Sequence, residues 1–252
     1  MKLSQWNGDF GGIDYVSLIV IDIDGRMRAV SLPSSFADEA VLKKGIGFDA
    51  SNFGYAKVHA SDMVAVPDMD TAFIEQKGEF DILHVFCDVR TTEGELFEQY
   101  PRSVIRAAHS ALMESGIGDD IKMLVELEFY VFEEVRYSTA TDHSYYFVGS
   151  SEGIGEDYRD APWIRLSQGY HRMAPEDRYQ LLRNRAVKTM IDVDIPVKYH
   201  HHEVVAAQLE IELDFISMLK AGDAVSLAKW ILRSEADELG LKVTFMPKPM
   251  YK

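Results

Sequence analysis

The chain has 252 residues, of which 47% are hydrophobic and 27% are charged, and this is the composition of an ordinary globular protein. It carries 26 Lys and Arg residues against 41 Asp and Glu residues, which gives a formal net charge of −15. Nucleic acids and anionic membranes both attract clustered basic residues. The charge therefore excludes nucleic acid and membrane surfaces as expected partners.

The single cysteine, Cys87, leaves no intramolecular disulfide, as is usual in a reducing compartment. Residues 1–10 lack the apolar core of a signal peptide. The longest apolar runs, such as residues 18–21, are far shorter than a membrane span. We therefore expect a cytoplasmic protein.

The first part of the chain, residues 1–97, is rich in predicted strands. Residues 15–23 and 27–32 flank Asp24-Gly25, which predicts a β-hairpin. Further elements are expected as a short helix at 36–43, a glycine-rich loop at 45–57, and strands at 63–67 and 80–89. This pattern indicates a small β-rich domain.

From residue 100 onward the predicted order is α-β-α-β-β-α-β, which is typical of a layered domain with a sheet core. Pro101 is expected to begin a helix that Gly116 ends. The other elements are a strand at 121–132, a polar aperiodic segment at 133–162, a helix from Pro175 to Met190, strands around 193–205 and 208–215, a helix at 217–239, and a strand at 241–247. The predicted fold class is α+β.

Two glutamates lie on one face of the predicted strand at 121–132. Alternate strand residues share a face, so Glu126 and Glu128 point together while Leu127 and Phe129 form an apolar face. One interpretation is a solvent-facing strand end, at which the glutamates only confer solubility.

The segment 208–215 repeats the pattern. Its polar residues alternate with apolar ones: Gln208, Glu210, Glu212 and Asp214 against Leu209, Ile211, Leu213 and Phe215. Glu203 precedes Glu210 by seven positions, so two adjacent strands could bring four carboxylates together. Two such charges about 6 Å apart repel by about 3 kcal/mol at an effective dielectric of 20. Four carboxylates form six such pairs, and their summed repulsion rivals the ~5–15 kcal/mol that stabilises a domain.

Such a cluster must be protonated, spread into water or neutralised by cations. Oxygen ligands favour Mg²⁺ or Mn²⁺, and four negative charges would balance two divalent ions. The neighbouring histidines, residues 200–202, cannot all bind one metal, because successive strand residues point to opposite faces. The alternative to metal binding is that these histidines form hydrogen bonds within the core.

Six segments in order carry a resemblance to a known family. They are GFDASNFGYAK with SDMVAVPDMDT, CDVRTTEGELFEQYPRSVI, VELEFYVFE, QGYHRMAPEDRYQLLRNR, HHHEVVAAQLEI and TFMPKPMY. Together they resemble motifs of the type I glutamine synthetases of bacteria and archaea, over the N-terminal portion of that family. The resemblance implies a β-grasp-like domain over residues 1–97, followed over 98–252 by the first part of an α/β-barrel catalytic domain.

The resemblance also implies roles for single residues. The metal ligands, for two Mg²⁺ or Mn²⁺, would be Glu126, Glu128, Glu203 and Glu210. Asp49 would bind ammonium and take its proton, Tyr170 would lie near the ammonium, and Glu203 would belong to the catalytic set. Phe215 would lie near the nucleotide.

The resemblance implies that the protein is a ligase whose substrates are ATP, glutamate and ammonia. ATP phosphorylates the glutamate side chain, and ammonia then displaces phosphate from γ-glutamyl phosphate. The family forms homo-oligomers with sites between subunits, so Asp49 would serve a neighbouring subunit.

Several positions depart from the family pattern. Asn52 replaces a serine, His59-Ala60 replace acidic residues, and Lys198 replaces an acidic residue before the histidines. The family's later arginine-rich segment follows its FMPKP motif, so we expect the isolated 252 residues to be inactive. Two alternatives remain open. One is a γ-glutamyl-amine or polyamine ligase, because the loop at 49–60 is altered. The other is a non-catalytic homologue that acts in assembly or regulation.

Overall fold

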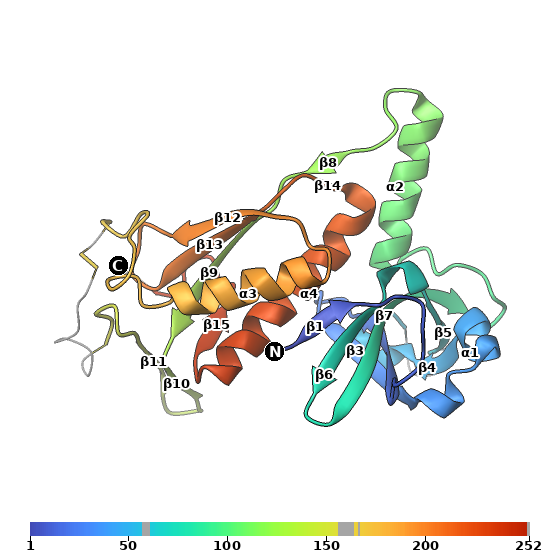
Figure 1. Ribbon diagram of the computed structural model, residues 1–252, viewed down its shortest axis with the longest axis horizontal. Helices are drawn as coiled ribbons and strands as arrows, with labels where there is room; N and C mark the ends of the chain where they lie inside the picture. Colours follow the sequence, from blue (N-terminus) through green and yellow to red (C-terminus); the bar gives the residue numbers. More distant parts are fainter. Residues whose placement is uncertain (57–60, 156–163, 166, 251–252) are drawn as a thin grey trace. The chain divides into compact units, whose positions relative to one another are not determined.

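The computed structural model describes residues 1–56, 61–155, 164–165 and 167–250 (Figure 1). His59-Ala60 and part of the segment 133–162 lie outside the described residues. The chain divides into two compact units, and helix α4 (Met218–Glu238) contributes to both. The N-terminal unit comprises Met1–Met123, Asp192–Asp194 and Ile216–Leu227, and the C-terminal unit comprises Leu124–Ile191, Ile195–Phe215 and Ala228–Lys252. The domain boundary at residue 97 stays a prediction.

The N-terminal unit contains, within the described residues, a seven-stranded sheet of order β1-β6-β7-β2-β3, with β5 paired to β7 and β4 paired to β5. Its strands are β1 (Leu3–Gln5), β2 (Tyr15–Ile21), β3 (Met27–Pro33), β4 (Ile46–Asp49), β5 (Asp62–Pro67), β6 (Phe73–Lys77) and β7 (Phe80–Thr91). Strands β2 and β7 run parallel, and the other pairs are antiparallel. Every residue of β2 after Tyr15 is buried, so this strand lies at the centre of the core.

The predicted hairpin at Asp24-Gly25 is confirmed, since it joins β2 to β3. Gly25 has a φ of 75°, a left-handed conformation that glycine adopts without strain. The Asp22 carboxylate accepts hydrogen bonds from the backbone N–H groups of Asp24 and Arg26. These bonds hold the turn in place.

Helices α1 (Glu39–Lys44) and α2 (Pro101–Ser115) also belong to this unit. The predicted ends of α2 are confirmed, because Pro101 begins it and Gly116 follows it with a φ of 69°. The loop predicted at 45–57 is partly wrong, because β4 pairs with β5 and a 3₁₀ helix, Ala50–Phe53, follows. The short strands β1 and β6 were not predicted, since neighbouring backbones rather than a long apolar pattern define them.

The C-terminal unit is built on an antiparallel four-stranded sheet of order β12-β13-β9-β15. Its strands are β9 (Glu126–Phe132), β12 (Val197–His202), β13 (Gln208–Leu213) and β15 (Lys242–Thr244). Helix α3 (Gln180–Asp192) and the later part of α4 lie along this sheet (Figure 1). Arg185 and Thr189 of α3 both bind the Glu235 carboxylate of α4, which fixes the two helices together.

Three expectations for this half of the chain are corrected. The strand at 121–132 is interrupted: β8 (Lys122–Met123) pairs with β14 (Ile216–Ser217), and β9 starts at Glu126. The segment 133–162 contains a hairpin of β10 (Glu134–Thr139) and β11 (Ser144–Gly149), which lacks the apolar alternation that would reveal it. Helix α3 starts at Gln180, five residues after Pro175. None of the described helices is both long enough and apolar enough to cross a membrane.

Candidate metal centre

The pairing of three strands gathers acidic side chains on one sheet face. The register of β9 and β13 places Glu128 opposite Glu210 and Glu126 opposite Glu212. On the other side of β13, His201 of β12 lies opposite Glu210. Glu203 directly follows β12, and its N–H donates to the Gln208 carbonyl. The chain therefore brings residues about 80 positions apart into one cluster through ordinary antiparallel pairing.

The opposite sheet face is apolar, as the alternation predicts. Leu127 and Phe129 of β9, with Leu209 and Ile211 of β13, are buried. Packing of this face fixes the register, because a slip of one residue would turn every side chain over. The acidic cluster is thus held by the hydrophobic core beneath it.

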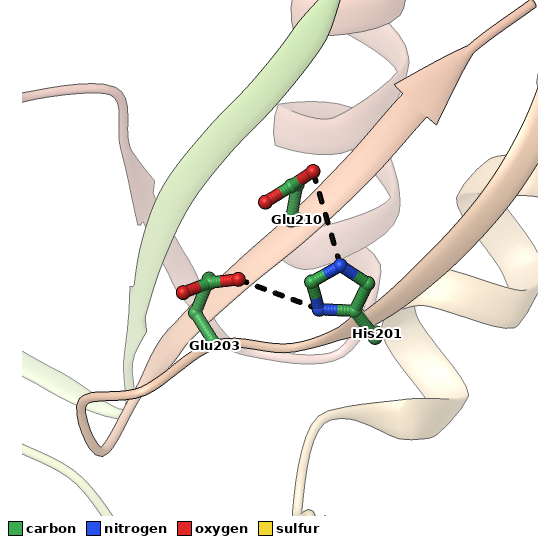
Figure 2. Close-up of side chains that lie close together, drawn as sticks. All are labelled: His201, Glu203 and Glu210. Atoms are coloured by element: carbon green, nitrogen blue, oxygen red, sulfur yellow. Dashed lines mark ion pairs between the residues drawn. The ribbon is translucent and has the colours of Figure 1, made fainter. Parts of the chain in front are cut away.

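His201 lies between two carboxylates (Figure 2). Its Nδ1 is 3.4 Å from Glu203 Oε1, and its Nε2 is 3.8 Å from Glu210 Oε1. Within the described residues, one set of possible ligand atoms less than 4.8 Å apart comes from His201, Glu203 and Glu210. A second set comes from Glu126, Glu210 and Glu212, so Glu210 is common to both.

Glu210 shows the electrostatic cost of this arrangement. The residue is only 8% exposed. Burial, followed by the nearby charges of Glu203, Glu126 and Glu128, raises the pKa of the Glu210 carboxyl to about 7. Burial and three neighbouring carboxylates therefore all oppose a negative charge on Glu210.

Glu212, two residues along the same strand face, has the opposite electrostatics. Lys198 Nζ lies 2.6 Å from Glu212 Oε1, and the Tyr199 hydroxyl donates to Glu212 Oε2. The hydrogen bond from Lys198 lowers the pKa of Glu212, and the bond from Tyr199 adds to that effect. Glu212 is therefore a carboxylate whose cation the chain itself supplies.

Two further bonds orient the ligand carboxylates. Gln208 Nε2 donates to Glu128 Oε2 at 2.7 Å, and the N–H of Val204 donates to Glu203 Oε2 at 3.0 Å. Such neighbours fix how a carboxylate faces its ligand. Each leaves at least one oxygen lone pair of the carboxylate available.

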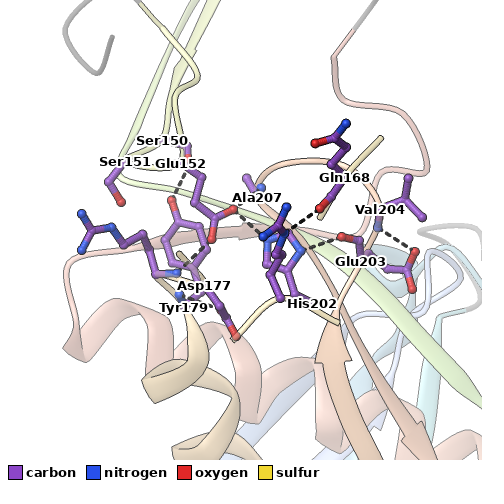
Figure 3. A network of polar contacts seen from close by, with 12 residues as sticks. Ser150, Ser151, Glu152, Gln168, Asp177, Tyr179, His202, Glu203, Val204 and Ala207 are labelled. Carbon is purple, nitrogen blue, oxygen red and sulfur yellow. Dashed lines mark hydrogen bonds and ion pairs between the residues drawn. The ribbon is translucent and has the colours of Figure 1, made fainter. Parts of the chain in front are cut away.

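The other two histidines face different partners, as expected from strand alternation. Arg183 Nε donates to His200 Nδ1 at 3.2 Å. His202 is fully buried, with Nε2 2.9 Å from Glu152 Oε2 and Nδ1 2.5 Å from the Glu203 carbonyl oxygen (Figure 3). Burial by itself lowers the pKa of His202, but the hydrogen bond and charge of Glu152 raise it above the ordinary value.

Glu152 ties several segments together behind the cluster. Its Oε2 accepts from the N–H of Ala207 at 2.6 Å, and its Oε1 accepts from the N–H of Arg178 at 3.0 Å. Gly169 packs so closely here that a Cβ would lie 2.4 Å from the Glu203 carbonyl oxygen. This network holds the turn between Glu203 and Ala207 in place. The sequence gives no sign of it, because Glu152 lies in an aperiodic segment.

The remaining predicted residues have different surroundings. Tyr170 lies beside the cluster, with its ring centroid 5.2 Å from that of His201. Phe215, predicted on the apolar face of its strand, is instead 62% exposed, because β13 ends at Leu213. Asp49 ends β4 in the N-terminal unit, where hydrogen bonds from Ser51 lower the pKa of its carboxyl.

The donor set matches a hard divalent cation. Glu210, where burial already opposes negative charge, belongs to both sets of possible ligand atoms. Glu128 lies opposite Glu210 in the strand register but belongs to neither set. Carboxylate oxygens are the ligands that Mg²⁺ and Mn²⁺ prefer. Within the described residues, no Lys or Arg forms an ion pair with Glu126, Glu128, Glu203 or Glu210. The residues therefore fit a divalent metal.

Comparisons with family models give two matches. Residues 12–92 match the glutamine synthetase β-grasp domain, and residues 98–252 match the glutamine synthetase catalytic domain. The predicted fold class, α+β with a β-grasp domain followed by a glutamine synthetase catalytic domain, is confirmed.

Curated relatives and solved structures agree with these matches. The chain is 31% identical over 250 residues to a glutamine synthetase of Nostoc sp., covering 95% of this chain and 53% of that protein. It is 34% identical over 244 residues to the glutamine synthetase of Aquifex aeolicus, covering 94% of this chain and 52% of that protein.

A glutamine synthetase structure from Plasmodium falciparum superposes with a TM-score of 0.90 at 25% identity, over 96% of this chain and 49% of that one. The chain thus spans about half the length of the relatives it matches. The matches to both family domains, which together account for most of its length, show that the chain belongs to the glutamine synthetase family.

Proposed function

We propose that this chain functions in an ATP-dependent ligase that joins ammonia to the side-chain carboxylate of glutamate. The observation that carries the proposal is the carboxylate cluster centred on Glu210, on three paired strands of a glutamine synthetase catalytic domain. ATP and glutamate would give γ-glutamyl phosphate and ADP. Attack by ammonia would then release phosphate and leave the amide.

The cluster would hold Mg²⁺ or Mn²⁺ through Glu126, Glu128, Glu203 and Glu210. A bound divalent ion offsets the negative charge of the transferred phosphoryl group. The position of His201, between Glu203 and Glu210, makes it an additional candidate ligand. The bonds from Gln208 and Val204 would keep Glu128 and Glu203 aimed at the metal.

The other roles follow the family resemblance. Asp49 would bind ammonium and accept its proton in the site of a neighbouring subunit of a homo-oligomer, and its lowered pKa keeps it anionic. Tyr170, beside His201, would line the ammonium pocket. Exposure of the Phe215 ring leaves it available to a nucleotide base. Cys87 is a buried free thiol, in keeping with a cytoplasmic location.

The test is phosphate release from ATP by the protein made from its complete coding sequence, with glutamate, ammonia and Mg²⁺. We expect release that requires all four components and that is lost in Glu203→Gln. The Glu114→Gln variant is a matched control, because Glu114 is an exposed residue of α2. Phosphate release that is absent, or that does not need glutamate, would reject the proposal.

The same assay distinguishes the nucleophile. Asn52, where the family has serine, lies in the 3₁₀ helix directly after Asp49 and motivates an amine-specific alternative. Putrescine or ethanolamine in place of ammonia should give little product if ammonia is the substrate. A clear preference for either amine would instead favour the γ-glutamyl-amine ligase.

A further inference from the structure

The two possible cation positions on the acidic face differ in one respect. The first set of ligand atoms, from His201, Glu203 and Glu210, is not paired with any Lys or Arg within the described part of the chain. The second set, from Glu126, Glu210 and Glu212, has the Lys198 ammonium directly against it. The two sets on this face thus differ in whether a lysine or arginine of the described residues is paired with them.

We infer that the Lys198 ammonium acts as a built-in cation for the Glu126–Glu210–Glu212 set and keeps a second divalent ion out of it. The inference rests on the proposed metal centre and adds to it a count of ions. The four proposed ligands would share one divalent ion per chain, on the Glu203 side of the cluster, and no second ion would bind on the Glu212 side.

Two contacts hold the ammonium in position. Lys198 Nζ lies 2.6 Å from Glu212 Oε1 and 5.0 Å from the centroid of the Tyr199 ring. A cation over an aromatic face is attracted by the ring quadrupole. Tyr199 is in turn fixed by its own bond to Glu212 and by its strand position opposite that residue. The lysine is therefore directed to the cluster from an ordered edge strand.

The carboxylate that binds the ammonium is part of a larger set of possible ligands. Glu126 belongs to the same ligand set as Glu212. A divalent ion bound there would lie close to this ammonium, and the two positive charges would repel each other.

A lysine in this place also differs chemically from a metal. It neutralises one charge and cannot release a coordinated water or exchange ligands. A tethered ammonium leaves Glu210 free to complete the first position, since Lys198 bonds to Glu212. Lys198 therefore excludes a second divalent ion by charge repulsion, whatever the size of that ion.

The test counts Mn²⁺ ions per chain by electron paramagnetic resonance and by native mass spectrometry. Wild type should bind about one Mn²⁺. Lys198→Met keeps the length of the side chain, removes its charge, and should raise the count to about two. Because both ions would share Glu210, the variant should also show magnetic coupling between them. Lys198 is 46% exposed on its side chain, so its replacement does not disturb the core.

Two matched variants complete the design. Lys198→Arg preserves the charge and should stay at about one ion. The double variant Lys198→Met/Glu212→Gln should also return to about one, because it removes a ligand of the second set. Failure of Lys198→Met to gain an ion, or two ions in wild type, would overturn the inference. Glu128→Gln tests the proposed metal centre separately, because it should weaken the first ion alone.

Discussion

Two groups of carboxylates in this chain differ in where their neutralising charge comes from. In the N-terminal unit, Arg102 binds Asp68 and Asp88 at 2.7 Å and Asp223 at 3.1 Å. Arg106 adds contacts to Asp68 and Asp88. Three carboxylates thus share two guanidinium groups, and the group is electrostatically nearly complete.

The Glu126, Glu128, Glu203 and Glu210 group of the C-terminal unit has no such partner within the described residues. His201 is its nearest basic side chain, and Glu210 keeps a pKa raised to about 7 by burial and by the neighbouring carboxylates. The comparison teaches that acidic clustering alone does not mark a metal centre. The informative feature is a cluster that is held by the core and whose members form no ion pair with a Lys or Arg of the described residues.

The largest predicted effect concerns the arginine-paired group. Arg102→Ala should lower the free energy of unfolding by about 3–5 kcal/mol, because it removes the buried guanidinium that three partly buried carboxylates share. Burial already raises the pKa of Asp223 even beside Arg102. Urea unfolding measures the loss. Arg106→Ala is the control, since Arg106 is 44% exposed on its side chain and should cost less than about 1 kcal/mol. Equal effects of both variants would contradict a central role for Arg102.

The second prediction concerns the metal-free glutamate group and its pH dependence. The folded-state pKa of Glu210 is about 7, against an ordinary value of 4.5, so the folded protein holds a proton that the unfolded chain has released between these values. Its contribution to stability is therefore present at low pH and falls as pH rises through this window, by up to about 3 kcal/mol. Urea unfolding in chelator at several pH values measures this slope.

Glu210→Gln should remove most of that slope, since glutamine does not titrate. Saturating Mn²⁺ should do the same in the wild type by stabilising the deprotonated carboxylate. If the stability of the wild type in chelator instead increased between pH 4.5 and about 7, the pKa of Glu210 could not be raised in the folded state.

The smallest predicted effect lies at Glu212. Tyr199→Phe removes one hydrogen-bond donor while Lys198 still binds the carboxylate. We expect a loss of about 0.5–1.5 kcal/mol in unfolding free energy, as for a typical hydrogen bond, and no change in Mn²⁺ affinity. Calorimetric unfolding and Mn²⁺ titration together measure this. A large drop in Mn²⁺ affinity would mean that Glu212 takes part in the metal centre.

The sequence predicted the acidic and apolar faces of β9 and β13 because strand side chains alternate with a period of two. Ordinary helix signals likewise placed α2 between Pro101 and Gly116. The antiparallel register that sets Glu128 opposite Glu210 depends on packing between distant segments, so sequence could suggest it without fixing it.

Other parts of the candidate site could not be predicted from local pattern. Which histidine faces the carboxylates depends on where β12 begins, and the structure selects His201. Glu152 reaches His202 from 50 positions away in a segment without periodicity. The Lys198 and Glu212 pair likewise exists only once β12 and β13 are aligned. These contacts are set by tertiary structure, which residue spacing does not encode.

The most direct test of the account is a calorimetric Mn²⁺ titration of the wild-type chain beside Glu210→Gln, with Glu134→Gln of β10 as the control. The account predicts saturable binding by wild type and by the control, with an affinity more than about tenfold weaker in Glu210→Gln. Wild-type protein that binds no Mn²⁺, or a Glu210→Gln variant that binds it as tightly as wild type, would contradict the claim that this cluster is a metal centre.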